Sequence, residues 1–260
     1  MKNSNPNKGA LVLSQLSISF GGLKAVSDFS LTLKPQELIG LIGPNGAGKT
    51  TIFNLITGVY APDTGSMLLG EKKLTGLPPF KITQNGIART FQNIRLFADL
   101  TVLQNVLISY HFRVPYGYID AFLRNRRFLK REAELIEKAV NLLKLMKLDH
   151  RMDHRAGSLS YGDQRRVEIA RALATEPQIL CLDEPAAGLN SGEKVELMKT
   201  VADIRKTFGV TILIIEHDMK LVMGICERIV VMDRGEIIAQ GGPREIQENP
   251  RVIEAYLGVA

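Results

Sequence analysis

Only two cysteines, Cys181 and Cys226, occur in the sequence, and they stand far apart in apolar surroundings. Two such thiols form neither a disulfide framework nor a metal quartet, so we expect a protein of a reducing compartment. Long apolar runs are also lacking: the longest strand-like run covers residues 210–215, far short of the ~18 residues that a membrane-spanning helix needs. Residues 1–10 lack the apolar stretch of a signal peptide. The sequence therefore predicts a cytosolic protein, soluble or peripheral to a membrane.

Composition and charge are those of an ordinary globular protein. Hydrophobic residues make up 45% and charged residues 23% of the 260 positions, which excludes wholesale disorder, collagen and a coiled coil. At ~150 residues per domain, the length predicts one or two domains with a sizeable core. The net charge of +6 permits an anionic partner such as a nucleotide, a nucleic acid or a lipid headgroup, but it selects none of them.

The first part of the chain has the pattern of half-buried strands. Apolar and polar side chains alternate along residues 11–20 and 29–33, and a further short strand is expected at residues 67–69. Turn sequences at residues 21–22 and 34–36 separate these segments. Such alternation is typical of an antiparallel sheet with one packed face and one wet face.

Three later segments are continuously apolar instead. They cover residues 37–43, 178–183 and 210–215, and such runs are typical of strands buried on both faces of a parallel sheet. Helices are expected between them, at residues 49–57, 164–175 and 193–208. Alternating strands and helices predict an α/β layered domain.

Residues 93–160 contain no comparable strand. An amphipathic helix is expected at residues 132–148, with a single apolar stripe made of Ile136, Ala139, Val140, Leu143 and Met146. This pattern predicts a helical subdomain inserted into the α/β core. Towards the C-terminus, a hairpin is expected over residues 230–239, followed by a short helix.

The strongest local motif is G-x-x-x-x-G-K-T at residues 43–50. It lies between an expected strand and an expected helix, as its chemistry requires. Glycines let backbone N–H groups curl around phosphate oxygens, and the helix N-terminus adds a positive dipole. Lys49 would reach the β- and γ-phosphates, and the Thr50 hydroxyl would ligate Mg²⁺. These residues predict a nucleotide site.

Polar residues also end the other two buried runs. Asp183 and Glu184 follow residues 178–182, and His217 follows residues 210–215. Ligands of open α/β sheets bind at the carboxyl ends of the strands, so these endings are expected to converge on the nucleotide site. There Asp183 would hold Mg²⁺ and Glu184 would polarise the attacking water. Each could instead be a solvated or structural strand end.

Residues 159–164 form a small-residue turn before an amphipathic helix. Ser160 and Asp163 fit the S-x-x-D pattern of a capping box. A turn that opens a helix is also a potential anion site. The sequence alone leaves both interpretations open.

The order of these motifs, together with Gln92, resembles the nucleotide-binding subunit of ABC transporters. The resemblance covers essentially the whole chain. It implies an α/β fold, namely a P-loop NTPase (ABC ATPase) core with an antiparallel β subdomain and an inserted helical subdomain, in a single domain over residues 1–260. Residues 10–92 and 161–240 would form the nucleotide-binding core and its antiparallel layer, residues 93–160 the helical subdomain with the signature motif at its end, and residues 241–260 a C-terminal tail helix.

The resemblance also implies ligands and residue roles. ATP and Mg²⁺ would be bound; Gln92, Glu184 and His217 would be catalytic, and Thr50, Gln92 and Asp183 would hold the metal. Ser160 and Gly162 would contact the γ-phosphate of ATP bound by a second subunit, and Phe20 would stack on adenine unless it is a core strand residue. The full set of implied ATP contacts is Phe20, Gly43, Pro44, Asn45, Gly46, Ala47, Gly48, Lys49, Thr50, Thr51, Ser160 and Gly162.

The chain departs from the family pattern at three positions. Where the signature motif is usually L-S-G-G-Q, this sequence has Tyr161 and Asp163, and Asn190 replaces the family aspartate of the D-loop. Asn190 keeps a hydrogen-bonding group but loses the charge. The sequence does not say whether these substitutions change the contacts of either motif.

Longer segments point to one branch of the family. Residues 20–26, 89–97, 183–190, 216–224 and 255–258 resemble the G-type ATPase of branched-chain amino acid (Liv-type) importers. ATPases of urea importers and lipopolysaccharide exporters share parts of this set. We therefore expect an ATP-hydrolysing subunit that powers import of a small solute, branched-chain amino acids in the first place, through a membrane permease.

Partners and location follow from the same resemblance. We expect a second ABC ATPase, identical or paralogous, two membrane permease subunits and, indirectly, a solute-binding protein, but no nucleic acid. The chain would lie at the cytoplasmic face of a bacterial inner membrane, as a peripheral protein. A soluble ABC ATPase of DNA repair or translation is the alternative from another class, although such chains normally carry two cassettes or long coiled-coil insertions. A non-hydrolysing regulatory module is disfavoured by the intact Lys49, Asp183, Glu184 and His217.

One stretch has no assigned role. Aromatic residues Tyr110, Phe112, Tyr116, Tyr118 and Phe122 precede a basic cluster made of Arg124, Arg126, Arg127, Lys130 and Arg131. A cluster of cations is usually a solvated face. Amphipathic aromatic residues beside cations could also form a surface for a partner or for lipid headgroups.

The nucleotide site can be tested at Lys49. Lys49→Ala removes the positive charge that faces the β- and γ-phosphates, so ATP binding and ATP hydrolysis should both collapse. Isothermal titration calorimetry with ATP measures the binding half. An affinity equal to that of the wild type would contradict the assignment of residues 43–50 as a phosphate-binding loop.

Overall fold

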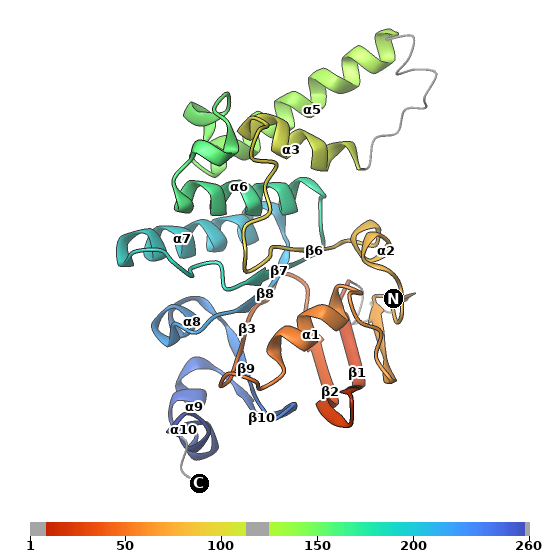
Figure 1. Ribbon diagram of the computed structural model, residues 1–260, viewed down its shortest axis with the longest axis vertical. Helices are drawn as coiled ribbons and strands as arrows, with labels where there is room; N and C mark the ends of the chain where they lie inside the picture. Colours follow the sequence, from red (N-terminus) through yellow and green to blue (C-terminus); the bar gives the residue numbers. More distant parts are fainter. Residues whose placement is uncertain (1–8, 113–124, 258–260) are drawn as a thin grey trace, which may run out of the picture.

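The computed structural model describes residues 9–112 and 125–257, which form two β-sheets with helices on both sides (Figure 1). The smaller sheet is antiparallel, with the strand order β2-β1-β4-β5. Its strands are β1 (Leu11–Phe20), β2 (Leu23–Leu33), β4 (Thr64–Leu69) and β5 (Lys72–Lys73). The antiparallel layer predicted from alternation is therefore confirmed, and the turn between β1 and β2 lies at Gly21 and Gly22 as expected.

The larger sheet has six strands in the order β10-β9-β3-β8-β7-β6. Strands β9, β3, β8, β7 and β6 run parallel, and β10 pairs antiparallel with β9 as the predicted hairpin. The bounds are β3 (Leu38–Ile42), β6 (Ile87–Arg89), β7 (Ile179–Asp183), β8 (Thr211–Ile215), β9 (Arg228–Asp233) and β10 (Glu236–Gly241). The three continuous apolar runs form β3, β8 and β7, which are neighbours in the sheet.

Each central strand faces two separate hydrophobic clusters. In β8, Ile212 and Ile214 belong to the cluster shared with helices α6 and α7, whereas Leu213 and Ile215 belong to the cluster shared with α1 and the antiparallel sheet. All five residues of β8 are buried. Because both faces of the strand pack against apolar side chains, its sequence is an unbroken run of hydrophobic residues and shows no alternation.

Helices cover both faces of the larger sheet (Figure 1). One face carries α1 (Lys49–Ile56) and the antiparallel sheet, and α2 (Pro79–Gln84) precedes β6. The opposite face carries α6 (Tyr161–Ala174), α7 (Ser191–Phe208) and α8 (Met219–Ile225). The helices expected at residues 49–57, 164–175 and 193–208 are confirmed as α1, α6 and α7.

The segment between β6 and α6 is helical in its described part, as predicted. It contains α3 (Val102–His111), α5 (Arg126–Leu145) and two short 3₁₀ helices, η1 (Asp149–Arg151) and η2 (Ala156–Ser158). Helix α5 begins earlier than predicted because the Asn125 side chain caps it by accepting from the Phe128 N–H, 2.9 Å away.

The buried face of α5 differs from the predicted stripe. Ile136 is 43% exposed, while Ala139, Leu142, Leu143 and Met146 are buried. The placement of Ile136 in the stripe was therefore wrong: the N-terminal half of α5 rises away from the body of the molecule, beyond the helices that bury its C-terminal half (Figure 1).

The aromatic and basic stretch is described only in part. Tyr110 is buried in α3 and Phe112 is exposed. The four residues of the basic cluster that lie in α5 (Arg126, Arg127, Lys130 and Arg131) are all exposed. Tyr116, Tyr118, Phe122 and Arg124 lie outside the described residues.

The C-terminal segment contains two helices, α9 (Pro243–Gln247) and α10 (Pro250–Leu257), rather than the one tail helix predicted. The break has a local cause, because a residue that precedes proline is driven out of the helical conformation and proline lacks an N–H donor. Within the described residues, no helix has the length and apolar character needed to cross a membrane.

Candidate functional site

The loop between β3 and α1 holds the predicted phosphate-binding motif in a conformation that requires glycine. Gly43, Gly46 and Gly48 have φ angles of 150°, 81° and 97°. A Cβ atom on Gly43 would lie 2.1 Å from the Met232 carbonyl oxygen, and one on Gly48 would lie 2.8 Å from the Ala25 carbonyl oxygen. The loop is thus packed tightly against β2 and β9, with its backbone free to curl around an anion.

Lys49 is folded back over this loop. Its side-chain nitrogen donates to the carbonyl oxygens of Gly43 and Pro44, at 2.7 Å and 2.8 Å. Lys49 is only 6% exposed, and burial lowers the pKa of its ammonium group, an effect that the nearby Glu184 charge opposes. The ammonium group is therefore held at the loop, where phosphate oxygens can replace the two carbonyl oxygens as its acceptors.

The three residues expected to be catalytic meet at the ends of neighbouring strands. One carboxylate oxygen of Glu184 lies 2.6 Å from His217 Nε2, and the other accepts from Gln92 Nε2 at 3.1 Å. The Glu184 backbone N–H donates to the Ile215 carbonyl oxygen of β8, at 2.9 Å. Glu184 has a φ angle of 46°, in the left-handed region. Its carboxylate is consequently oriented from both sides on a constrained backbone.

Asp183 has a partner that the sequence analysis did not identify. Arg89, at the end of β6, pairs with the Asp183 carboxylate at 2.7 Å, and both side chains are buried. Arg89 also donates to Asn54 Oδ1 of α1 at 2.7 Å. Arg89 thus neutralises Asp183 and ties β6, β7 and α1 together. Nothing in the local sequence marks Arg89, because its partners come from distant parts of the chain.

A cavity of about 570 Å³ contains most of the predicted site. The predicted residues that line it are Asn45, Gly46, Ala47, Gly48, Lys49, Thr50, Thr51, Gln92, Glu184 and His217. Leu23, Lys24, Ala25 and Arg234 also line it and were not predicted. The volume is in the range of small-molecule sites.

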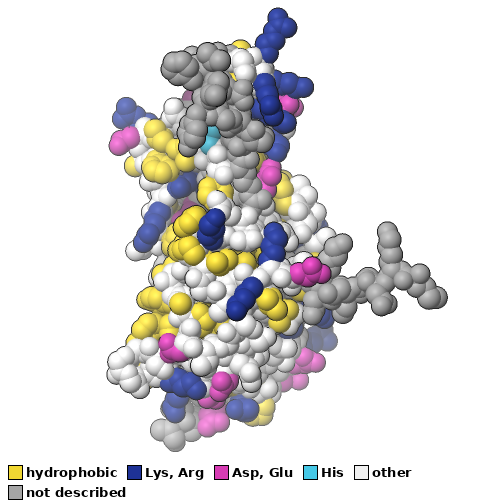
Figure 2. All heavy atoms as spheres, turned by 90° about the vertical axis from the view of Figure 1, so that its right-hand side faces the viewer, with side chains coloured by type: hydrophobic (Ala, Val, Ile, Leu, Met, Phe, Trp, Pro, Cys, Tyr) yellow, Lys and Arg dark blue, Asp and Glu magenta, His cyan; other side chains and the backbone are white. Residues whose placement is uncertain are grey.

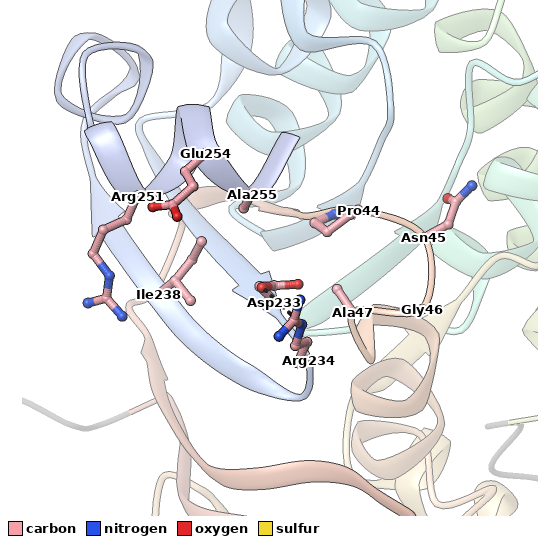
Figure 3. Close-up of a pocket in the computed structure, with 10 residues that line it drawn as sticks. All are labelled: Pro44, Asn45, Gly46, Ala47, Asp233, Arg234, Ile238, Arg251, Glu254 and Ala255. Carbon is pink, nitrogen blue, oxygen red and sulfur yellow. Dashed lines mark ion pairs between the residues drawn. The ribbon is translucent and has the colours of Figure 1, made fainter. Parts of the chain in front are cut away.

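A second hollow lies behind the same loop. Figure 3 shows residues 44–47 of the loop facing Arg251, Glu254 and Ala255 of α10, with Asp233, Arg234 and Ile238 between them. The C-terminal helix α10 therefore lines one hollow together with the phosphate-binding loop.

Two predicted site residues, Phe20 and Asp183, do not line the cavity of about 570 Å³. Phe20 is 43% exposed at the end of β1, and its ring meets the Tyr60 ring edge-on with centroids 5.1 Å apart. It is therefore no core residue, and the exposure leaves it accessible to a planar ligand. The adenine contact itself stays a prediction.

The signature residues also lie outside the cavity of their own chain. Ser160 is the N-cap of α6 and accepts from the Asp163 N–H at 3.3 Å. The reciprocal half of the predicted capping box is missing, because the Asp163 carboxylate pairs with Arg166 at 2.6 Å instead. Ser160 is exposed, and neither it nor Gly162 lines the nucleotide cavity.

The donors at the cavity fit a magnesium ion in part. Thr50 and Gln92 line the cavity and offer oxygen ligands, which this hard cation prefers. Asp183 is engaged by Arg89. Among residues 9–112 and 125–257, no group of three or more His, Cys, Asp or Glu side chains could hold a metal ion. A metal here would thus depend on phosphate oxygens for much of its coordination.

A strand–glycine-loop–helix unit with a lysine at the loop and a carboxylate opposite it defines a P-loop ATPase. Sequence comparison adds the family. The model of the ABC transporter family matches residues 26–187, and that of the branched-chain amino acid ATP-binding cassette transporter matches residues 236–260. The chain belongs to the ABC transporter family, as one of its ATP-binding ATPase domains.

Individual relatives and structures agree with this assignment. The chain is 48% identical to the high-affinity branched-chain amino acid transport ATP-binding protein LivG of Escherichia coli K12, over 96% of this chain and 98% of the relative. It is 45% identical to BraF of Pseudomonas aeruginosa, over 96% and 98% of the two chains. The crystal structure of the ADP conformation of MJ1267, an ATP-binding cassette of an ABC transporter, superimposes with a TM-score of 0.83 at 34% identity, covering 95% of this chain and 98% of that one.

The role of Glu184 can be separated from ATP binding. Glu184→Gln keeps the size of the side chain and most of its hydrogen bonding, but removes the charge and basicity that the predicted general base needs to activate a water molecule. Because a positioned general base typically contributes ~10²–10⁴-fold, hydrolysis should fall by that order while ATP affinity persists. A phosphate-release assay and calorimetry measure the two effects.

The two measurements together distinguish a catalytic role from a structural role for Glu184. Near-normal phosphate release would exclude Glu184 as the base. Loss of ATP binding would make it a structural residue. Glu254→Gln, on the far side of the loop in α10, is the matched control and should change neither quantity.

Proposed function

We propose that this chain is the ATP-hydrolysing subunit of an importer of branched-chain amino acids. The observation that carries the proposal is the convergence of Lys49, Glu184, Gln92 and His217 on one cavity, in a chain whose relatives are named as branched-chain amino acid transport ATP-binding proteins. The match of residues 236–260 to the branched-chain family supports the same solute class. No described feature favours a urea importer, a lipopolysaccharide exporter or a soluble ATPase.

Within the site, different residues of this chain have different roles in ATP hydrolysis. Lys49 exchanges the carbonyl oxygens of Gly43 and Pro44 for the β- and γ-phosphates. Glu184 takes the proton of a water molecule whose oxygen attacks the γ-phosphorus, while the bond to the bridging oxygen breaks and ADP leaves. Gln92 and His217 fix the orientation of that carboxylate.

Magnesium, held by Thr50, Gln92 and the phosphate oxygens, would supply charge neutralisation as ADP and phosphate separate. Asp183, whose carboxylate is paired with Arg89, would be the third side chain to hold this metal. Phe20 and the loop residues 43–51 bind the nucleotide itself.

The functional unit we propose is a dimer of ABC ATPases. Ser160 is exposed and lies outside its own nucleotide cavity together with Gly162, so both can contact ATP held by a second chain, identical or paralogous. MJ0796, a bacterial ABC transporter cassette with a TM-score of 0.74 at 27% identity, over 90% of this chain and 99% of that one, is a dimer. Because such contacts form only in the closed state, ATP favours closure.

The surface for the permease lies beside Gln92. A groove of about 650 Å³ is lined by α2, α3, α6 and the segment after Gln92, including Phe91, Arg95, Leu96, Phe97 and Arg171. Phe97 is 48% exposed. The α2 and α3 side of the molecule carries hydrophobic side chains with Lys and Arg among them (Figure 2). An apolar groove with arginines at its wall suits a permease loop that carries an acidic residue.

We propose that the chain works at the cytoplasmic face of a bacterial inner membrane, attached through two permease subunits that receive solute from a binding protein. The domain division given above (residues 10–92 and 161–240, residues 93–160, and residues 241–260) is part of the same proposal. We propose no contact with nucleic acid.

Permease docking predicts a site-specific crosslink. A cysteine at Leu96 or Phe97 should crosslink to a permease loop in membranes, because both side chains line the groove. The natural cysteines Cys181 and Cys226 are buried and should not form crosslinks. Glu248→Cys, exposed at the end of α9, is the control and should give no crosslink. Reproducible absence of crosslinks at both groove positions would contradict this surface.

The solute is tested by uptake. In cells that lack their own copy of this chain, the wild type should restore uptake of radiolabelled leucine, and Lys49→Ala should abolish it because ATP no longer binds. Labelled urea, taken up by the same cells, is the comparison. Restoration of urea uptake without leucine uptake would overturn the solute class and leave the ATPase assignment intact.

A further inference from the structure

Arg165 carries a charged guanidinium group in the interior of the protein, where burial of a charge costs free energy. It lies on α6 with 0% exposure, and four hydrogen bonds surround its guanidinium group. Two of these go to main-chain carbonyl oxygens, those of Phe91 at 2.6 Å and Gln92 at 2.8 Å. A third goes to Glu168 at 2.8 Å. Burying such a pair is expensive relative to apolar packing, so its retention suggests a need for the geometry it imposes.

Glu168 also binds the backbone of the segment formed by Phe91 and Gln92. Its second carboxylate oxygen accepts from the Phe91 N–H at 3.2 Å. Burial raises the pKa of Glu168, and the Phe91 N–H and Arg165 oppose that shift. Helix α6 thereby holds three main-chain groups of Phe91 and Gln92. The segment that presents the Gln92 side chain to Glu184 is fixed to α6.

The fourth bond of Arg165 leads to the signature motif. Its guanidinium group donates to the Tyr161 hydroxyl at 2.9 Å. Tyr161 stands between Ser160 and Gly162 in the first turn of α6. Its ring also packs on the D-loop, since a Cβ atom on Gly188 would lie 3.1 Å from Tyr161 Cε1. An unbroken chain of contacts thus runs from the signature motif through Tyr161 and Arg165 to Gln92.

We propose that Tyr161 and Arg165 are positioning residues that couple the two nucleotide sites of the dimer. This inference rests on the proposed function, in which Ser160 and Gly162 touch the ATP of the second chain. Any shift of the first turn of α6 on contact with that ATP moves Tyr161 and Arg165, and with them the Phe91 and Gln92 backbone. The orientation of Glu184 in this chain then depends on whether the partner's site is occupied.

The test removes only the hydroxyl group of Tyr161. Tyr161→Phe keeps the ring against Gly188, so the fold and the isolated nucleotide site should persist. The ATP affinity of the monomeric chain, measured by calorimetry, should equal that of the wild type. The hydrolysis rate at saturating ATP should fall about tenfold, the loss expected for one hydrogen bond to a charged group. The Hill coefficient for ATP, above one in the wild type, should approach one.

Two further variants separate positioning from folding. Tyr110→Phe in α3 removes another tyrosine hydroxyl, in a different cavity beside Lys138, and should keep the wild-type rate and Hill coefficient. Arg165→Lys keeps the charge beside Glu168, but an ammonium group has only three donors and lacks the planar fork, so it cannot replace all four hydrogen bonds of the guanidinium group. It should therefore reproduce the loss of cooperativity. Amide hydrogen exchange at Phe91 should be faster in Arg165→Lys than in the wild type.

The outcomes distinguish this inference from the proposed function. A wild type that hydrolyses ATP with a Hill coefficient of one overturns the coupling, and so does Tyr161→Phe with an unchanged Hill coefficient. A wild type that neither hydrolyses ATP nor dimerises overturns the proposed function itself. A lower melting temperature of Tyr161→Phe with unchanged cooperativity assigns Tyr161 a structural role and also overturns the coupling.

Discussion

The carboxylate of Glu184 is held between Gln92 and His217, and this interaction depends on the order of strands in the larger sheet. Strands β3, β8, β7 and β6 are consecutive neighbours. Their carboxyl ends supply the phosphate-binding loop, His217, Glu184 and Gln92 in turn. Each strand is buried on both faces, so none can slide without exposing apolar side chains. Hydrophobic burial of the strands thus helps to set the distances of 2.6 Å and 3.1 Å at the carboxylate.

Two adjacent carboxylates at one strand end create an electrostatic conflict that the fold resolves by giving them separate partners. Arg89 takes Asp183 into a buried ion pair, while Lys49 and His217 lie on the side of Glu184. Asp183 therefore does not add a free negative charge beside Glu184. The segregation leaves Glu184 as the carboxylate that lines the nucleotide cavity.

The features that could be predicted from sequence are those that depend on neighbours in the chain. The loop at residues 43–50 is read from its own glycines, and the ends of β7 and β8 from the apolar runs before them. Arg89 and Arg165 escaped prediction because each binds a site residue that is remote in the sequence: Asp183 is 94 residues from Arg89, and Gln92 is 73 residues from Arg165. Ile136 is exposed because α5 extends beyond the neighbouring helices. The spacing of apolar residues along the sequence carries no information about that extension. The break between α9 and α10, in contrast, has a local signal in Pro250.

The departures from the family motifs acquire physical reasons in the structure. Asn190 caps α7 by accepting from the Glu193 N–H at 3.0 Å, while its own N–H donates to Glu193 at 2.9 Å. Asparagine caps a helix about as well as aspartate does, so the replacement keeps the backbone of the D-loop and removes only a charge. Tyr161 occupies space beside Gly188 of the same loop. The first turn of α6, which carries Ser160 and Gly162, is thereby packed against the loop that precedes α7. The face that we propose for a second chain is therefore a single packed unit rather than two independent loops.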